Sequence, residues 1–214
     1  MDKTIQTTAE EAIRRSGAYS FLSLAYLDIP GERFFKLLRF PEVKDNLDKL
    51  GLDTDSLLSE HNNLKALEEE FTRLFIGPAH HLSPHESVHT EFQGSHWGEV
   101  TSEVQRFIEL AGFDIGHHFP GMPDHISVEL EFMGQMAQKE GLAWSEKNES
   151  KALDYIKIQS MFLDKHLLNW VDSFCDKVIE SCFLSFYREL AKWTSSFLWA
   201  DRKNLSRHDV TTTN

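Results

Sequence analysis

The chain has 214 residues, enough to bury a core in one domain or two small ones without disulfides or metals. It carries 22 lysines and arginines against 34 aspartates and glutamates, a formal charge of −12. This acidity argues against nucleic-acid binding, which needs a basic surface, and favours basic partners. No segment approaches the roughly 20 apolar residues that a membrane-spanning helix requires.

Hydrophobic periodicity predicts helices almost throughout, and alternating β-branched runs with hairpin turns are missing from the sequence. We therefore expect an all-α fold without a sheet. The polar ends, 1–7 and 203–214, are expected to fray. The predicted helices cover residues 8–27, 31–40, 42–50, 54–76, 98–112, 124–140, 150–180 with an interruption near His166, and 183–201.

The first predicted helix contains two adjacent arginines, Arg14 and Arg15, followed by an apolar run. This order superficially resembles a twin-arginine signal peptide. However, Glu10 and Glu11 precede the arginines, and no small-residue cleavage site follows the apolar run. We therefore interpret the segment as the first helix of the fold.

The fourth predicted helix has an apolar face formed by Leu64, Leu67, Phe71, Leu74 and Phe75. The segment after it contains residues that end one helix and start another. Gly77 is expected to close this helix in a left-handed conformation, and Pro78 excludes another turn. Ser83 is expected to cap a new helix, with Pro84 at its first position. Glu86 would then reach back to the serine amide.

Residues 112–123 form the best internal boundary, because three glycines and two prolines among twelve residues cannot continue a helix. We expect an N-terminal helical half over 1–111, a connector over 112–123 and a C-terminal helical half over 124–214. A connector of this kind lets two chains exchange halves, so we expect a monomer together with a domain-swapped homodimer.

Two carboxylates near the start of the second half stand out. Asp124 precedes an apolar helix, where its side chain is expected to cap the free amides of that helix. Glu129 lies in the middle of the apolar arc of the same helix, whereas Glu131 points away from it. A buried carboxylate must be paired, hydrogen-bonded or protonated. We expect an ion pair between Glu129 and an arginine or histidine, the alternative being contact with a ligand.

The 11 histidines raise the question of a metal site. Four of them define a second hypothesis, a metal-dependent helical enzyme: His80, His81, His85 and His89. His81, His85 and His89 are four residues apart, but they cannot form a ligand set on one helix because Pro84 prevents a helix from running through all three. No HExxH or CxxC motif accompanies them. We therefore expect neither a metal nor a cofactor.

The sequence also lacks the signatures of covalent catalysis and of a disulfide. Ser87 has no nucleophile elbow around it, and no phosphate-binding loop is found. Cys175 and Cys182 are seven residues apart in a helical pattern, which separates their Cα atoms by roughly 10 Å, too far for a disulfide. We expect two buried free thiols, as in a reducing compartment.

Three blocks of sequence resemble the TorD/DmsD family. The first is the run 71–78 followed by Pro84, Glu86 and Ser87; the second is 123–133; the third is 162–170 with Phe174 after it. The resemblance extends over the whole chain and is strongest to the trimethylamine N-oxide reductase branch. It implies cytoplasmic chaperones, not enzymes, that mature molybdenum-containing redox enzymes exported by the twin-arginine route.

The resemblance also implies a site. In the family, the Asp-His pair that matches Asp124 and His125 is linked to binding of the partner's signal peptide. An apolar groove around 71–87 and 123–133 would take the client, with contributions from Phe75, Gly77, Pro78, Pro84, Glu86 and Ser87. Weak guanine-nucleotide binding is reported within the family, but no motif here would hold a nucleotide. A helical regulatory module that binds an unrelated peptide is a third hypothesis.

Overall fold

The computed structural model describes residues 3–77, 81–90, 98–113 and 122–209. Within these ranges the chain contains helices and no strand, which confirms the all-α prediction. The elements are α1 (Lys3–Leu27), α2 (Glu32–Leu38), α3 (Pro41–Lys49), α4 (Thr54–Ser59), the 3₁₀ turn η1 (Glu60–Asn63), α5 (Leu64–Phe71), the π turn η2 (Thr72–Ile76), α6 (Glu86–Thr90), α7 (Glu99–Leu110), α8 (Ile126–Ser145), α9 (Glu149–Phe162), the π turn η3 (Leu163–Leu167), α10 (Leu168–Ser181) and α11 (Ser185–Asp209).

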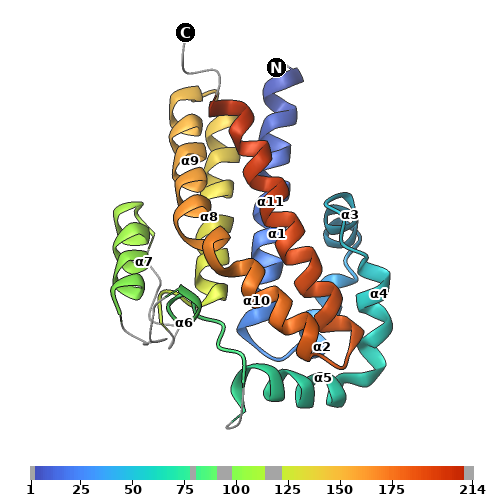
Figure 1. Ribbon diagram of the computed structural model, residues 1–214. Coiled ribbons are helices and arrows are strands. Elements are labelled where there is room, and N and C mark those ends of the chain that lie inside the picture. The colour runs from blue at the N-terminus through green and yellow to red at the C-terminus, as the bar shows by residue number, and fades with distance from the viewer. Residues whose placement is uncertain (1–2, 78–80, 91–97, 114–121, 210–214) are drawn as a thin grey trace.

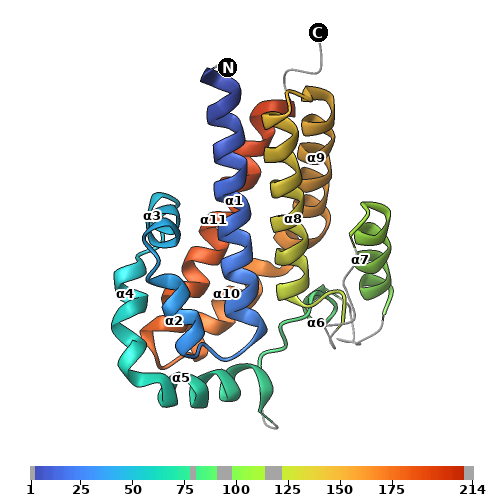
Figure 2. The same cartoon turned by 180° about the vertical axis from the view of Figure 1, so that it is seen from behind.

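The long helices α1, α8, α9 and α11 run side by side and form the main bundle (Figure 1). Helix α10 extends the bundle below α9. The short helices α2 to α5 wrap one flank and the lower end, while α6 and α7 lie on the opposite flank (Figure 2). Apolar side chains from nearly every element meet in one continuous core.

Two glycines allow α1 and α8 to approach closely. A Cβ atom at Gly141 would lie 2.8 Å from Cδ1 of Ile13, and one at Gly134 would lie 3.3 Å from Oγ of Ser20. Because the glycines are seven residues apart, both face α1 from the same side of α8. The first helix of the N-terminal half is therefore packed directly on the first helix of the C-terminal half.

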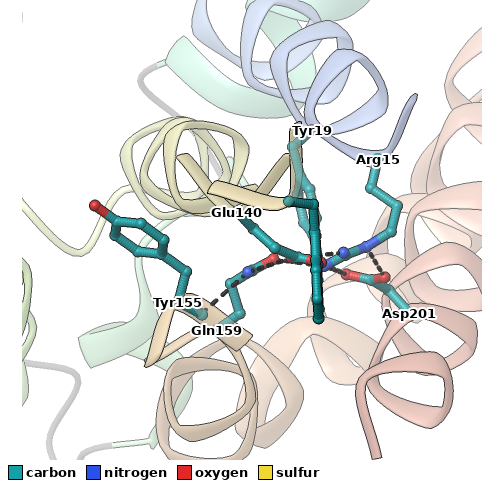
Figure 3. Close-up of polar contacts among 7 residues, drawn as sticks. Arg15, Tyr19, Glu140, Tyr155, Gln159 and Asp201 are labelled. Atoms are coloured by element: carbon teal, nitrogen blue, oxygen red, sulfur yellow. Dashed lines mark hydrogen bonds and ion pairs between the residues drawn. The ribbon is translucent and has the colours of Figure 1, made fainter. Parts of the chain in front are cut away.

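A buried polar network also ties the bundle together at this level (Figure 3). Arg15 of α1 forms an ion pair with Asp201 of α11 and a second, at 2.9 Å, with Glu140 of α8. Gln159 of α9 donates to the same Glu140 carboxylate at 2.8 Å and accepts a hydrogen bond from Arg15. Tyr19 donates to Asp201 at 2.6 Å. The paired arginines thus belong to a helix of the fold, as we predicted from the sequence.

Several predicted helix boundaries differ from the structure. The predicted helix 54–76 is divided into four short elements, because Asn63 adopts a non-helical backbone conformation (φ −118°, ψ 36°). Helix α11 continues to Asp209 although 203–214 was expected to fray, since Leu205 is buried in the core. The predicted interruption near His166 is confirmed by the π turn η3.

Cys175 and Cys182 are both buried and free, as predicted. Burial raises the pKa of the Cys175 thiol well above its ordinary value, so this thiol stays protonated. Across the described ranges, no helix combines the length and apolar character needed to cross a bilayer.

Candidate functional site

The first and second sequence blocks meet in the structure. Glu86 N–H donates to the Asp124 carbonyl at 2.9 Å, and Ile126 N–H donates to the Pro84 carbonyl at 2.9 Å. These bonds form an antiparallel bridge between His85 and His125. We refer to residues 83–87 and 122–127 as the loop pair. It includes the first two residues of α6 and of α8 and fixes the start of one helix against the start of the other.

Asp124 caps α6 rather than the helix that follows it. Its Oδ2 accepts a hydrogen bond from Ser87 N–H at 3.1 Å, and the side chain is completely buried. The N-cap of α8 is instead His125, whose Nδ1 accepts from Ser127 N–H at 3.1 Å. Our prediction for Asp124 was therefore wrong. With His125 in the cap position, the preceding carboxylate lies outside α8 and reaches the neighbouring loop.

The capping box predicted for residues 83–86 is also not formed, because α6 begins only at Glu86. The Ser83 hydroxyl lies 3.1 Å from Nδ1 of His85. The Ser83 carbonyl accepts from Nε2 of His89 at 2.8 Å. The Glu86 carboxyl group points into the core, so it does not reach back to the serine amide.

Two glutamates, Glu86 of the loop pair and Glu129 of α8, are buried close to each other. Nδ1 of His166 lies 3.1 Å from Oε2 of Glu86, and Trp170 Nε1–H donates to Glu129 at 3.3 Å. Burial, the adjacent Glu86 and Asp124 raise the pKa of Glu129 well above 4.5. Burial likewise raises the pKa of Glu86, with His166 acting in the opposite direction. Glu129 is buried and Glu131 exposed, as predicted.

The predicted ion pair of Glu129 with an arginine or histidine is wrong. Its neighbours are the indole of Trp170 and the carboxyl group of Glu86, and the nearby histidine pairs with Glu86 instead. A carboxyl group in such surroundings is most stable when protonated. Burial and the neighbouring carboxyl groups therefore favour the protonated form of Glu129 in the folded protein.

The third sequence block supplies the wall behind this cluster. His89 lies against Trp170 with ring centroids 5.2 Å apart, and Trp170 contacts Phe174 at 5.5 Å. Phe75 of the first block contacts Phe174 at 6.1 Å. All three blocks therefore converge at one end of α8, although they are far apart in the sequence.

Gly77 ends η2 without the left-handed conformation that we predicted, since its φ is −58°. Its N–H donates to the Thr72 carbonyl at 2.7 Å. A Cβ atom at this position would lie 3.2 Å from that same oxygen. Close backbone approach, and not a positive φ, explains the glycine. Pro78 lies outside the described residues.

Most of the predicted site residues offer little surface. Asp124, Glu86, Ser87, Pro84 and Phe75 are buried, whereas His125 and Gly77 are only partly buried. Next to His125, the partly exposed ring of His85 packs edge-on at 4.9 Å between centroids. Burial, followed by the neighbouring His85, lowers the pKa of His125 to about 3. The surface of the loop pair therefore carries two imidazoles over a buried acidic cluster, and burial disfavours the charged form of His125.

The geometry does not support the metal-enzyme hypothesis. Ser83 provides hydrogen-bonding partners for His85 and His89, and the described residues contain no group of three potential ligands placed to hold an ion. His80 lies outside the described residues. The Ser87 hydroxyl has no hydrogen-bond partner among the described residues, so no base activates it.

Two residues at the site were not predicted as members of it. His85 was considered only as a metal ligand, yet it pairs with His125 across the bridge. His166 was only part of the third block. The spacing of four that places Phe162, His166, Trp170 and Phe174 on one inward face is a signal that could have identified it.

Comparisons with known proteins identify relatives of this chain. Residues 41–176 match the family described as nitrate reductase delta subunit. The chaperone protein TorD of Vibrio vulnificus is 24% identical over 162 residues, covering 75% of this chain and 72% of the relative. TorD of Vibrio parahaemolyticus is 22% identical over 202 residues, covering 88% of this chain and 93% of the relative.

Among solved structures, a redox enzyme maturation protein from Archaeoglobus fulgidus shares the fold with a TM-score of 0.53. It is 21% identical, and the match covers 89% of this chain and 93% of that one. The matching relatives are named as chaperones and maturation proteins, not as catalysts. The chain therefore belongs to the nitrate reductase delta subunit family, which is the family of the TorD chaperones.

Proposed function

We propose that this protein is a cytoplasmic chaperone for a molybdenum-containing redox enzyme of the trimethylamine N-oxide reductase type. It binds the apo form of the client, its twin-arginine signal peptide, or both. Bound in this way, the client stays open for insertion of the molybdenum cofactor, and export is delayed until insertion is complete. The mechanism is binding and not bond chemistry.

The observation that supports this proposal most strongly is the convergence of the three blocks on the loop pair. The hydrogen bonds of the bridge lock Pro84 and Glu86 to Asp124 and Ile126. Such a rigid, preformed surface loses little conformational entropy when a peptide binds. The two imidazoles at the surface can exchange hydrogen bonds with the backbone of an extended or helical segment.

The buried residues have a positioning role in this proposal. Asp124 is fully buried, so its effect on a client acts through the amide of Ser87 and the orientation of α6. Glu86 anchors the same helix through His166. His85, His125 and Gly77 are the residues that would touch the client.

The charge of the chain fits a client segment that combines paired arginines with an apolar run. A formal charge of −12 attracts such a segment over a distance comparable to the screening length of the solution.

Co-purification with a defined client tests the proposal. The tagged protein is expressed anaerobically with a trimethylamine N-oxide reductase that carries its signal segment, and in parallel with the same enzyme lacking it. We expect the apo-enzyme to be recovered, in greater yield when the signal segment is present. Recovery of neither form, with both proteins folded and expressed, contradicts the proposal.

A further inference from the structure

Three buried carboxyl groups meet where α6 and α8 begin. They are Glu86, Asp124 and Glu129, with exposed fractions of 3%, 0% and 0%. In the described part of the chain, the basic group that pairs with them is His166, whose Nδ1 lies 3.1 Å from Oε2 of Glu86. Ionisation of all three acids would leave excess negative charge in the core, which is strongly unfavourable. A proton retained on one of the carboxyl groups removes this excess.

The contacts within this cluster indicate where the proton lies. Oε2 of Glu129 accepts from Trp170, whereas Oε1 is buried and has no donor among the described residues. Burial raises the pKa of Glu129 most, followed by the charge of Glu86, and a hydrogen bond with that same Glu86 adds to the rise. The two glutamates are therefore placed to share one proton between their carboxyl groups.

Helix α6 depends on this cluster for its position. It has five residues, too few to persist as an isolated helix in water. It packs against α7 and α10, and its first turn is bonded to Asp124 through the amides of Glu86 and Ser87. The Glu86 side chain adds the links to His166 of η3 and to Glu129 of α8. Ionisation of both glutamates would therefore place two adjacent negative charges at the point where α6 joins the bundle.

We propose that a proton shared by Glu86 and Glu129 holds α6 in place, and that loss of this proton releases α6 from the bundle. We call this pair of glutamates the α6 lock. When it opens, the hydrogen bond between the two carboxyl groups breaks and the proton passes to water or to a buffer base. The two carboxylates then repel each other, and each is better solvated when they separate. Glu129 is fixed within the long helix α8, whereas Glu86 belongs to a helix of five residues, so α6 is the element that moves.

Other ionisable groups surround the lock and titrate as well. They come from every element around it: Asp124, His85 and His125 of the loop pair, His89 of α6, Glu103 and Arg106 of α7, His166 of η3, and Lys177 of α10. All of them are retained when Glu129 is replaced by glutamine. The difference between the parent protein and Glu129→Gln therefore isolates the shared proton.

The lock acts in the free protein, and only its effect on a client rests on the proposed function. Glu86 N–H forms one of the two hydrogen bonds of the bridge, to the Asp124 carbonyl. Release of α6 breaks this bond and separates His85 from His125, so a client bound at the loop pair would dissociate more readily as the pH rises. A test on the free protein distinguishes failure of the lock from failure of the chaperone function.

Hydrogen exchange measured by mass spectrometry tests the lock between pH 5 and 8. The observed exchange rates of the α6 amides are compared with the intrinsic rates at each pH, which gives protection factors. Opening releases the shared proton, so the lock is strongest near pH 4.5 and weakens as the pH rises towards the folded-state pKa of Glu129. We expect the protection factor of α6 in the parent, relative to that in Glu129→Gln, to fall by up to tenfold per pH unit.

Three variants separate the shared proton from other effects. Glu129→Gln keeps an acceptor for Trp170 and offers Glu86 an N–H that does not ionise, so it should hold α6 at every pH. Glu86→Gln offers an N–H to ionised Glu129, so the total fall in protection between pH 5 and 8 should be smaller than in the parent. Glu131→Gln removes an exposed carboxylate of α8 and should match the parent. Circular dichroism verifies that each variant is folded.

The amides of α9 provide the reference for unfolding of the whole chain. They should be at least tenfold better protected than those of α6 at every pH, because α6 opens while the bundle stays folded. Equal protection of the two helices would overturn the inference. It would also be overturned by parallel pH profiles of the parent and Glu129→Gln, or by a Glu86→Gln profile identical to that of the parent. None of these results alters the expected co-purification of the client.

Discussion

At the scale of single residues, the site depends on polar groups that are buried and partnered across different parts of the chain. Asp124 stabilises helix α6 by accepting from an amide 37 residues earlier in the sequence, and His125 caps the helix that it precedes, α8. The two adjacent side chains thus have separate tasks. Their effects on stability and on client binding should differ accordingly.

Replacing Asp124 with alanine should destabilise the protein by about 1–2 kcal/mol, because the Ser87 amide loses its acceptor in the buried loop pair. Asp124→Asn retains an acceptor oxygen and should recover most of that loss. The free energy of unfolding in urea measures both. Exposed Asp176→Ala serves as the control. An alanine variant as stable as the parent would show that the cap contributes nothing.

Glu129 should make stability dependent on pH. Its pKa is raised in the folded protein above 4.5, so the folded state retains a proton that the unfolded chain releases. The resulting stabilisation is fully present below about pH 4.5 and is lost as the pH rises through the folded-state pKa. Glu129→Gln keeps an acceptor for Trp170 and cannot ionise, so it should remove this dependence.

The measurement compares urea unfolding of Glu129→Gln and the parent between pH 5 and 8. We expect the difference in unfolding free energy to shift in favour of the variant as the pH rises, by at most about 1.4 kcal/mol per pH unit. The pKa of His125 is lowered to about 3, so this residue makes stability depend on pH under acidic conditions. Its contribution is the same in both proteins and cancels from the difference in unfolding free energy. Exposed Glu131→Gln should match the parent at every pH. A Glu129→Gln profile parallel to the parent would mean that the glutamate is ionised when folded.

At the scale of helices, α1 is held in the bundle by the buried network around Arg15 (Figure 3). Arg15→Met would leave Asp201 and Glu140 without their cation in the core. We expect a loss of about 3–5 kcal/mol, measured by urea unfolding. Arg14→Met, one residue earlier and only partly buried, should cost less than 1 kcal/mol. Equal effects of the two substitutions would contradict the role assigned to the network.

The sequence predicted which side chains of a helix are buried, but it did not predict which residues of other elements they contact. The apolar face of α8 placed Glu129 inside and Glu131 outside, and the interruption near His166 was correctly located. The capping of α6 could not be predicted, because its cap comes from another loop. The same holds for Glu129, whose partners lie in α6 and α10. Helical periodicity reports which side of a helix is buried but carries no information on what lies opposite.

At the scale of the whole molecule, the two predicted halves meet along α1 and α8. The same contacts would form if the connector over 112–123 were extended and each half paired with the complementary half of another chain. We therefore predict a monomer that also yields dimers by domain exchange. Interconversion should be slow, because the glycine-mediated α1–α8 packing and the Arg15 network must separate first.

Size-exclusion chromatography with light scattering tests this prediction. Concentrated protein is incubated in mild denaturant, returned to buffer and compared with untreated protein. The dimer fraction should rise with protein concentration and persist after dilution. Arg15→Met should accelerate the exchange. A single monomeric species under all of these conditions would rule out domain exchange.

We propose that this protein recognises an immature client through the loop pair. The most direct test is the affinity of the purified protein for the apo and the cofactor-loaded forms of one molybdoenzyme, measured by calorimetry. We predict binding to the apo form, at least tenfold weaker binding to the loaded form, and loss of apo binding in His85→Ala/His125→Ala protein that remains folded. Equal affinity for both forms, or unchanged affinity in the double variant, would contradict the claim.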